Sequence, residues 1–159
     1  MKQQKRRGPE KPKRNAEQIY DFQQASHIIE LEAAVLGGII KEKDALTSVI
    51  DILKPDSFIS EKHEAIYQAI LLLFGKTEPV DLLTVSNQLR LSGELEFIGG
   101  ASYLARITSK SISSHIEKEA RIIVQYAIRR SIIKIMGEVV TKAYEDTTDV
   151  FHLMDTTEQ

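Results

Sequence analysis

The sequence contains no cysteine among its 159 residues, so a disulfide framework and thiolate metal sites are excluded. Long apolar runs are absent too, since no stretch approaches the roughly 20 apolar residues of a membrane-spanning helix. The basic N-terminus is not followed by an apolar segment and is therefore not a secretory signal. With an apolar fraction of 42%, we expect a soluble, cytoplasmic protein that buries a core without covalent or metal cross-links.

Charge is distributed unevenly along the chain. Residues 1–15 carry seven lysines and arginines against one glutamate, a formal charge of +6, which leaves −8 on the remaining residues. Few apolar side chains occur here to offset the entropy lost on ordering, so we predict that residues 1–25 form a basic, disordered tail. Such a tail could contact nucleic acid, or it could be a solvated leader. The lack of aromatic residues among the charges favours the leader.

Apolar residues recur with helical spacing almost everywhere from Ser26 onwards. The apolar stripe of the first predicted helix contains Ile28, Leu31, Val35 and Ile39. Gly37 and Gly38 lie inside this helix, although each glycine costs roughly 1 kcal/mol relative to alanine. A close approach of a second helix would explain why two are tolerated.

Four shorter helices are predicted to follow, each bounded by a proline, a glycine or a capping residue. In chain order, Pro55 ends the second helix, Ser60 caps and Gly75 ends the third, Pro79 and Asp81 open the fourth, Gly93 ends it, and Gly99-Gly100 introduces the fifth. No strand pattern of useful length and no internal repeat occurs. The expected fold class is therefore all-α, with a compact globule of about five short helices over residues 26–112.

Residues 113–146 have a different pattern. Ser114 and Glu117 match a capping box, and from there to Tyr144 the sequence has no proline and one glycine, Gly137. Such a length of helical pattern exceeds the needs of a small core, so we predict a long antiparallel helical hairpin with a tight bend. A hairpin cannot bury its apolar faces alone, which predicts a partner, most simply a second copy. Residues 150–154 have the pattern of a further helix, which indicates a piece of a longer protein.

Motifs for catalysis or ligand binding are missing. Residues 75–77 end like a phosphate-binding loop, but Ile70 stands where the first glycine is needed, so these residues are interpreted as a helix end. The four histidines lack the spacing of a metal site, and His63 is expected to be a packing or hydrogen-bonding residue. Glu30 and Glu32 are interpreted as helix surface charge. We therefore predict no catalytic, cofactor-binding or metal-binding residues, and no enzyme activity for this chain.

Five segments resemble one known family when taken together. They are Ile29–Gly37, then Pro55–Phe58 with His63, Ile66 and Tyr67, then Pro79–Val85, Leu95–Leu104 and Ala120–Ile122. From about Ile28 to Asp155, their order and spacing resemble the N-terminal domain of bacterial replicative DNA helicases of the DnaB type. The family usually has a proline and a capping residue just before the first helix, where this sequence has Ser26 and Ile28.

The resemblance implies a non-catalytic assembly and docking domain over residues 26–146. In the family the hairpins pair, and the domains form a collar of three dimers above the motor ring of a hexamer. The collar binds the C-terminal domain of primase, and a helicase loader is a further partner to consider. Residues 147–159 resemble the start of a linker to a separate ATPase domain, which uses ATP and Mg to unwind duplex DNA at the replication fork.

The family also implies where primase contact occurs, around Tyr103 and along the hairpin. The candidate residues are Tyr103, Ile132, Ile133 and Met136, with Arg129 and Arg130 at the predicted bend as a polar rim. The alternative is that Tyr103 and Ile132 are core or dimer residues, because apolar residues at helical spacing usually pack within their own protein.

A second function is a helical nucleic-acid-binding or adaptor module that uses the basic tail. The acidic remainder of the chain argues against it, because duplex DNA binding normally needs a basic face on the fold. Any DNA contact is therefore expected to be weak or confined to the tail.

Overall fold

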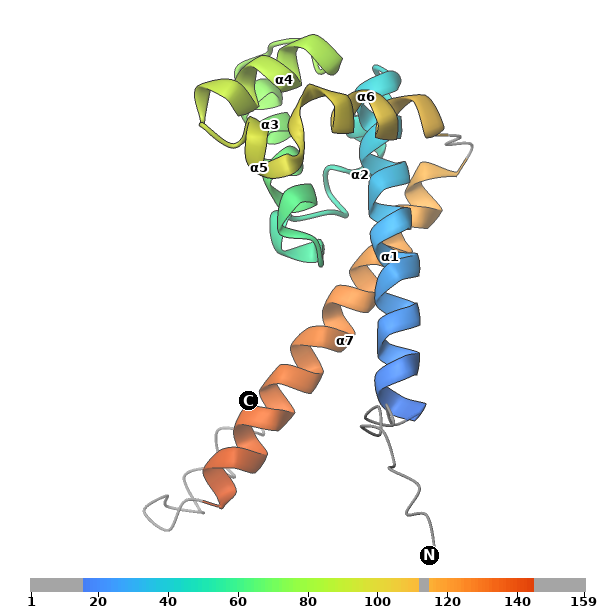
Figure 1. Ribbon diagram of the computed structural model, residues 1–159, viewed down its shortest axis with the longest axis vertical. Helices are drawn as coiled ribbons and strands as arrows, with labels where there is room; N and C mark the ends of the chain where they lie inside the picture. Colours follow the sequence, from blue (N-terminus) through green and yellow to red (C-terminus); the bar gives the residue numbers. More distant parts are fainter. Residues whose placement is uncertain (1–15, 112–114, 145–159) are drawn as a thin grey trace, which may run out of the picture.

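The computed structural model describes residues 16–111 and 115–144, which are helical apart from short connections (Figure 1). The elements are α1 (Ala16–Lys41), α2 (Ala45–Val49), the 3-10 turn η1 (Pro55–Ser57), α3 (Glu61–Gly75), α4 (Leu82–Leu91), α5 (Leu95–Ile98), α6 (Gly100–Lys110) and α7 (Ile116–Ala143). No strand occurs in these residues, so the predicted all-α class is confirmed. Of these helices, none is both long and apolar enough to span a membrane.

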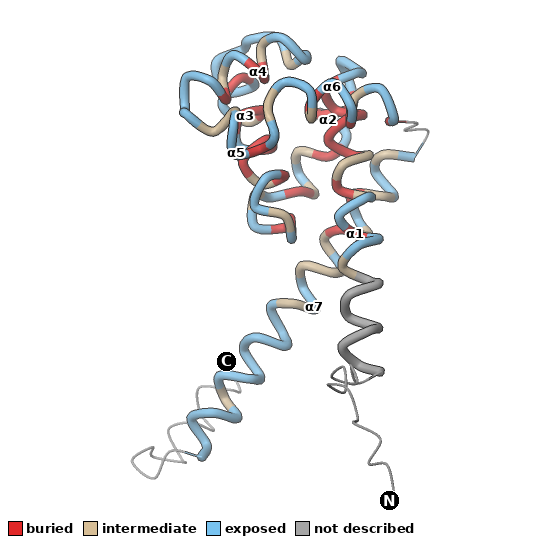
Figure 2. The backbone as a smooth tube through the Cα atoms, viewed as in Figure 1, coloured by how far each residue is buried: buried red, intermediate tan, exposed pale blue. Residues whose placement is uncertain are grey.

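The helices divide into a globule and a projecting part. Helices α2, α3, α4 and α6 contact α1, and α5 packs on α3, α4 and α6. Helix α7 packs against α1 before the two helices diverge (Figure 1). Figure 2 shows that the buried residues concentrate in the globule, whereas the far half of α7 is exposed. The largest fully buried side chains include Leu36, Ile66, Tyr67, Leu104 and Ile123. The core therefore joins α1, α3, α6 and the first turns of α7.

Helix α1 begins at Ala16, ten residues before the predicted start at Ser26. No proline or glycine occurs between Ala16 and Gly37, and the proline typical of the resembled family is missing here, so nothing local ends the helix earlier. The assignment of residues 16–25 to a disordered tail is therefore wrong. The basic stretch at residues 1–15 lies outside the described residues.

The predicted close approach of a second helix is confirmed at Gly37. A Cβ atom added there would lie 2.2 Å from the carbonyl oxygen of Ile107 and 3.0 Å from the Cβ of Ser111. Backbone of α6 therefore occupies the space that a side chain would need, and α1 and α6 can pack this closely only with glycine at this position.

Most predicted helix ends of the globule are confirmed, with one correction in α3. Asp81 caps α4, since its carboxylate accepts hydrogen bonds from the backbone N–H groups of Leu83 and Thr84 at 2.9 Å. Gly75, predicted to stop α3, is instead its last helical residue, and Thr77 adopts the left-handed conformation with φ 59°. The short helix α5 was not predicted, because its four residues are too few to show a period.

Helix α7 is a single helix of 28 residues, so the bend predicted at Arg129 and Arg130 is wrong. Arginine is a good helix former and Gly137 alone does not stop a helix, so no residue between Ile116 and Ala143 imposes a turn. His115 occupies the N-cap position, whereas the predicted capping residue Ser114 lies outside the described residues. The helical pattern at residues 150–154 and the linker assigned to residues 147–159 also lie outside them.

Candidate partner-binding surface

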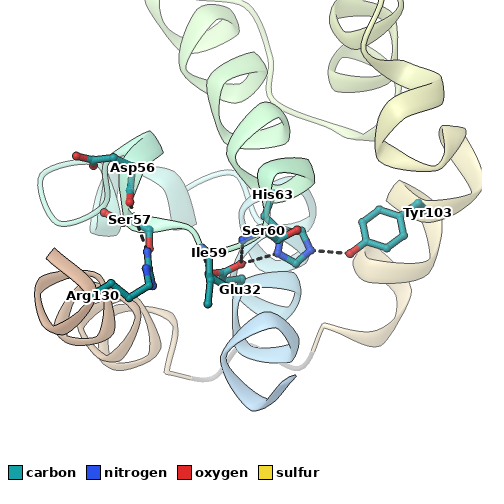
Figure 3. Close-up of polar contacts among 8 residues, drawn as sticks. All are labelled: Glu32, Asp56, Ser57, Ile59, Ser60, His63, Tyr103 and Arg130. Carbon is teal, nitrogen blue, oxygen red and sulfur yellow. Dashed lines mark hydrogen bonds and ion pairs between the residues drawn. The ribbon is translucent and has the colours of Figure 1, made fainter. Parts of the chain in front are cut away.

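The six residues predicted to bind a partner lie on two elements. Tyr103 is on α6 in the globule, whereas Arg129, Arg130, Ile132, Ile133 and Met136 are all on α7. Figure 3 shows two separate sets of polar contacts, one that joins Tyr103 to His63 and Glu32 and one that joins Arg130 to η1. The predicted residues therefore form two separate groups, which the globule connects.

The far part of α7 presents large apolar side chains to solvent. The exposed fractions of Ile132, Ile133 and Met136 are 52%, 71% and 50%. The other large apolar residues exposed on this helix or at its C-cap are Ile128, Ile135, Val140 and Tyr144. We call this set, from Ile128 to Tyr144, the α7 apolar row. Ile132 is thus not a core residue of this globule, and so large an apolar surface on one helix indicates an interaction site.

The two arginines of α7 have different environments. The Nη2 group of Arg130 donates hydrogen bonds to the carbonyl oxygens of Ser57, at 2.9 Å, and Asp56, at 3.5 Å (Figure 3). Arg130 is half-buried and fastens α7 to η1. The guanidinium of exposed Arg129 instead lies over the ring of Tyr126, 5.1 Å from its centroid. The polar-rim description therefore fits Arg129 better than Arg130.

Tyr103 is half-buried at the edge of the globule. Its hydroxyl lies 2.6 Å from Nε2 of His63, and the guanidinium of Arg106 lies 4.8 Å from the centroid of its ring. Burial raises the pKa of Tyr103 above its usual value, and the positive charge of Arg106 offsets part of that increase. The ring also lines a groove of about 490 Å³ between α1 and α6, together with Ala33 and Lys110.

His63 also contacts Glu32 of α1, whose side chain is fully buried. One oxygen accepts a hydrogen bond from the N–H of Ile59 at 2.6 Å. The other accepts one from the N–H of Ser60 at 3.3 Å and lies 2.8 Å from Nδ1 of His63 (Figure 3). Glu32 of α1 thus accepts hydrogen bonds from the N–H groups of the two residues that directly precede α3.

The interpretation of Glu32 as surface charge is therefore wrong, whereas the prediction of a hydrogen-bonding role for His63 is confirmed. A signal for Glu32 was present in the sequence. It lies four residues after Ile28 and four before Leu36, which places it within the apolar stripe of α1. A carboxylate inside such a stripe needs a buried partner, and that partner is His63, 31 residues later.

The series of Glu32, His63 and Tyr103, which we call the polar row, contains the same groups as a catalytic relay. Two of its three members are fully buried, however, and the tyrosine hydroxyl is directed at His63 rather than into a cavity (Figure 3). The described residues also contain no group of three or more side chains suited to hold a metal ion. The geometry favours a structural role for the polar row, with partner binding on the surfaces beside it.

Comparison with known proteins gives the family. The model of the DnaB-like helicase N terminal domain matches residues 24–125. The chain is 40% identical over 131 residues to the replicative DNA helicase DnaB of Rhodothermus marinus, covering 82% of this chain and 14% of that protein. It is 37% identical over 132 residues to the replicative DNA helicase DnaC of Bacillus subtilis, covering 82% of this chain and 29% of that protein. The chain thus spans less than a third of the length of either relative.

Solved structures agree with this match. The N-terminal domain of the Mycobacterium tuberculosis DnaB helicase is similar with a TM-score of 0.75 and 32% identity, covering 81% of this chain and 91% of that one. The N-terminal domain of the Helicobacter pylori DnaB helicase, described with its interactions with primase, has the same fold with a TM-score of 0.66 and 17% identity, covering 78% of this chain and 98% of that one. The chain described here belongs to the family of DnaB-like helicase N-terminal domains.

Proposed function

We propose that this chain is the non-catalytic assembly and primase-docking domain of a replicative DNA helicase. The observation that carries the proposal is the α7 apolar row, which the globule leaves exposed. Exposed apolar area of this kind is costly in water and is usually covered by a partner. Family membership supplies the two partners to consider, a second copy of the chain and primase.

Assembly through α7 accounts for the apolar row most simply. Two copies that pair along this helix would bury Ile132, Ile133 and Met136 on both sides of a symmetric interface. We propose that such dimers combine in threes to form the collar of a hexamer. The hairpin that would complete α7 requires residues after Tyr144, which lie outside the described part of the chain.

Light scattering over a range of protein concentrations tests assembly. The wild-type chain is expected to form a concentration-dependent dimer or a larger multiple, and Ile133→Asp is expected to lower the mass towards the monomer. Ser131→Asp is the matched control, because it adds the same charge at an exposed neighbouring position. A monomeric wild type at high concentration, or equal effects of the two variants, would contradict assembly through the α7 apolar row.

Primase docking is proposed at Tyr103, Ile132, Ile133 and Met136, with Arg129 and Arg130 beside them. Because the three apolar residues of α7 also lie in the proposed pairing surface, primase and a second copy would compete for them. The Helicobacter pylori domain and a DnaB-like replicative helicase of known structure are both described with their interactions with primase. The second of these structures, at 21% identity, supports the fold of this chain rather than the individual contacts.

The affinity for the C-terminal domain of the primase encoded by the same genome tests docking. Tyr103→Ala and Ile133→Ala are expected to weaken binding, each by about 1–2 kcal/mol if it removes an anchoring side chain. Leu91→Ala is the control, because Leu91 is an exposed apolar residue on α4 outside both predicted groups. Unchanged affinity in folded Tyr103→Ala and Ile133→Ala proteins would exclude these contacts.

The remaining activity is proposed for the longer parent protein. Its ATPase domain would use ATP and Mg to unwind duplex DNA during replication in the bacterial cytoplasm, and a helicase loader is a further partner to test. The basic stretch at residues 1–15 supports a second candidate function, weak binding to nucleic acid. DNA affinity measured across salt concentrations, with and without residues 1–18, separates that function from docking. An unchanged affinity after deletion would exclude the tail.

A further inference from the structure

Tyr103 forms a ridge between two hollows on the surface of the globule. With Arg106 it lines the groove of about 490 Å³ between α1 and α6. The same two side chains also line a hollow of about 430 Å³ next to Lys62, near the start of α3. A side chain shared by adjacent hollows forms the wall between them, so the angle of the Tyr103 ring decides the shape of both.

The hydroxyl end of Tyr103 is the part that fixes this angle. The ring contacts the guanidinium of Arg106 on one side, but Arg106 is itself an exposed side chain. The hydroxyl, in contrast, lies 2.6 Å from Nε2 of His63, which is fully buried. A single hydrogen bond to a fixed partner at the far end of the ring restricts rotation about both side-chain torsions.

His63 is fixed in turn by Glu32. The carboxylate of Glu32 accepts hydrogen bonds from two backbone N–H groups and lies 2.8 Å from Nδ1 of His63. A carboxylate can only accept, so Nδ1 carries the hydrogen of this contact, and Nε2 is the ring atom that faces the hydroxyl of Tyr103. The polar row therefore links the hydroxyl of Tyr103 to the carboxylate of Glu32 through the two ring nitrogens of His63.

We propose that His63, held by Glu32, is a positioning residue that orients the ring of Tyr103 for the docking partner. The inference rests on the proposed function, because it concerns how the same surface binds primase. His63 is fully buried, so it would act on the partner through Tyr103, whose hydroxyl lies at Nε2 and whose ring stacks on the imidazole with centroids 6.0 Å apart. An aromatic side chain already held in its bound orientation loses less conformational freedom on binding, which increases affinity.

Substitutions that remove the hydroxyl contact and keep the ring test the proposal. The measurement is calorimetric titration of the 159-residue chain with the C-terminal domain of the primase encoded by the same genome. Tyr103→Phe is expected to weaken binding by about 2- to 12-fold, the cost of ordering one side chain. His63→Asn is expected to weaken it equally, because its amide reaches the Nδ1 position next to Glu32 but not the Nε2 position next to Tyr103.

Two further variants separate positioning from a general effect on folding. His63→Gln is expected to recover most of the lost affinity, since its longer side chain can present an amide that hydrogen-bonds the hydroxyl of Tyr103 near the Nε2 position. Combining His63→Asn with Tyr103→Phe is expected to weaken binding no further than either change alone, because both remove the same contact. His115→Asn, an exposed histidine at the start of α7, is the matched control.

The outcomes are distinguishable from failure of the proposed function. If the wild type does not bind the primase domain, the proposed function fails and the positioning role fails with it. If Tyr103→Ala weakens binding but Tyr103→Phe does not, docking stands and the positioning role is refuted. Additive losses in the double variant refute it as well, and so does a His63→Asn protein that melts at a lower temperature but binds with wild-type affinity below its melting range.

Discussion

Replacing Gly37 by alanine is expected to destabilise the protein, although alanine is the better helix former. The added Cβ would lie 2.2 Å from the carbonyl oxygen of Ile107 and 2.7 Å from the carbonyl carbon. Ordinary contacts between nonbonded heavy atoms lie near 3.5 to 4.0 Å, so α1 and α6 must separate by about 1 Å or more. That carbonyl already accepts the N–H of Ser111 at 3.1 Å, and backbone cannot rotate away as a side chain could.

The magnitude follows from two opposing terms. Overfilling a packed interior costs about 1–3 kcal/mol, and a contact between two backbones belongs near the upper end of that range. The greater helix propensity of alanine returns about 1 kcal/mol. The net effect of Gly37→Ala is therefore a loss of about 2 kcal/mol in the free energy of unfolding, which for a chain of this length lowers Tm by about 4–8 °C.

Gly137→Ala is the matched control, since it makes the same change inside α7. No atom lies within 4 Å of a Cβ added at Gly137, so only the propensity term remains. This variant is expected to gain about 1 kcal/mol, or about 2–4 °C in Tm. Urea unfolding followed by circular dichroism measures both variants, at one fixed protein concentration because association also raises apparent stability. If Gly37→Ala is neutral or stabilising, the packing of α1 on α6 described here is incorrect.

Substitutions at three further positions test the polar contacts of the globule. Glu32→Ala leaves His63 and two backbone N–H groups without their acceptor. It is expected to lower the free energy of unfolding, measured in urea, by about 3–5 kcal/mol. A loss below about 1 kcal/mol would contradict the buried pair of Glu32 and His63. Asp81→Ala is expected to cost about 1 kcal/mol through loss of the α4 cap. Hydrogen bonds, above all from the backbone N–H of Thr84, hold the pKa of Asp81 below its ordinary value of 3.8. The difference in unfolding free energy between wild type and Asp81→Ala should therefore be present at neutral pH and shrink as the pH falls below 3.8. A difference that grows in acid would refute this cause. Arg130→Ala is expected to lower the free energy of unfolding by about 1 kcal/mol, because it releases α7 from η1. Arg130→Lys is expected to restore only part of this stability. Thermal unfolding of both variants measures the difference.

The helices of the globule could be predicted from the sequence because their signals are local. Ile66, Ile70 and Leu73 recur at helical spacing, and all three are buried in α3. Asp81 and Gly93 mark the two ends of α4 through side-chain capping and a left-handed φ of 77°, both of which depend on a few neighbouring residues. The resemblance to the family arises from the same segments, so the family could also be predicted.

The shape and exposure of the candidate surface could be predicted only in part. Ile132, Ile133 and Met136 are exposed apolar residues, as a docking role requires, but the bend expected beside them does not occur between Ile116 and Ala143. The sequence pattern indicated a long helical segment, but no proline or glycine near Arg129 and Arg130 supported the turn that we expected there. Since Arg130 continues the helix while its side chain bonds to η1, its role follows from a contact 73 residues away in the chain.

What the sequence by itself determined is therefore the all-α class, most helix boundaries and the family of the chain. Only the tertiary structure decided that Glu32 is buried, that it meets His63, and that His63 meets Tyr103. It also decided that Gly37 is the point where α6 approaches α1. The physical reason is that helix propensity and capping act over a few residues, whereas burial and pairing of polar groups depend on which distant helices the packed core brings together.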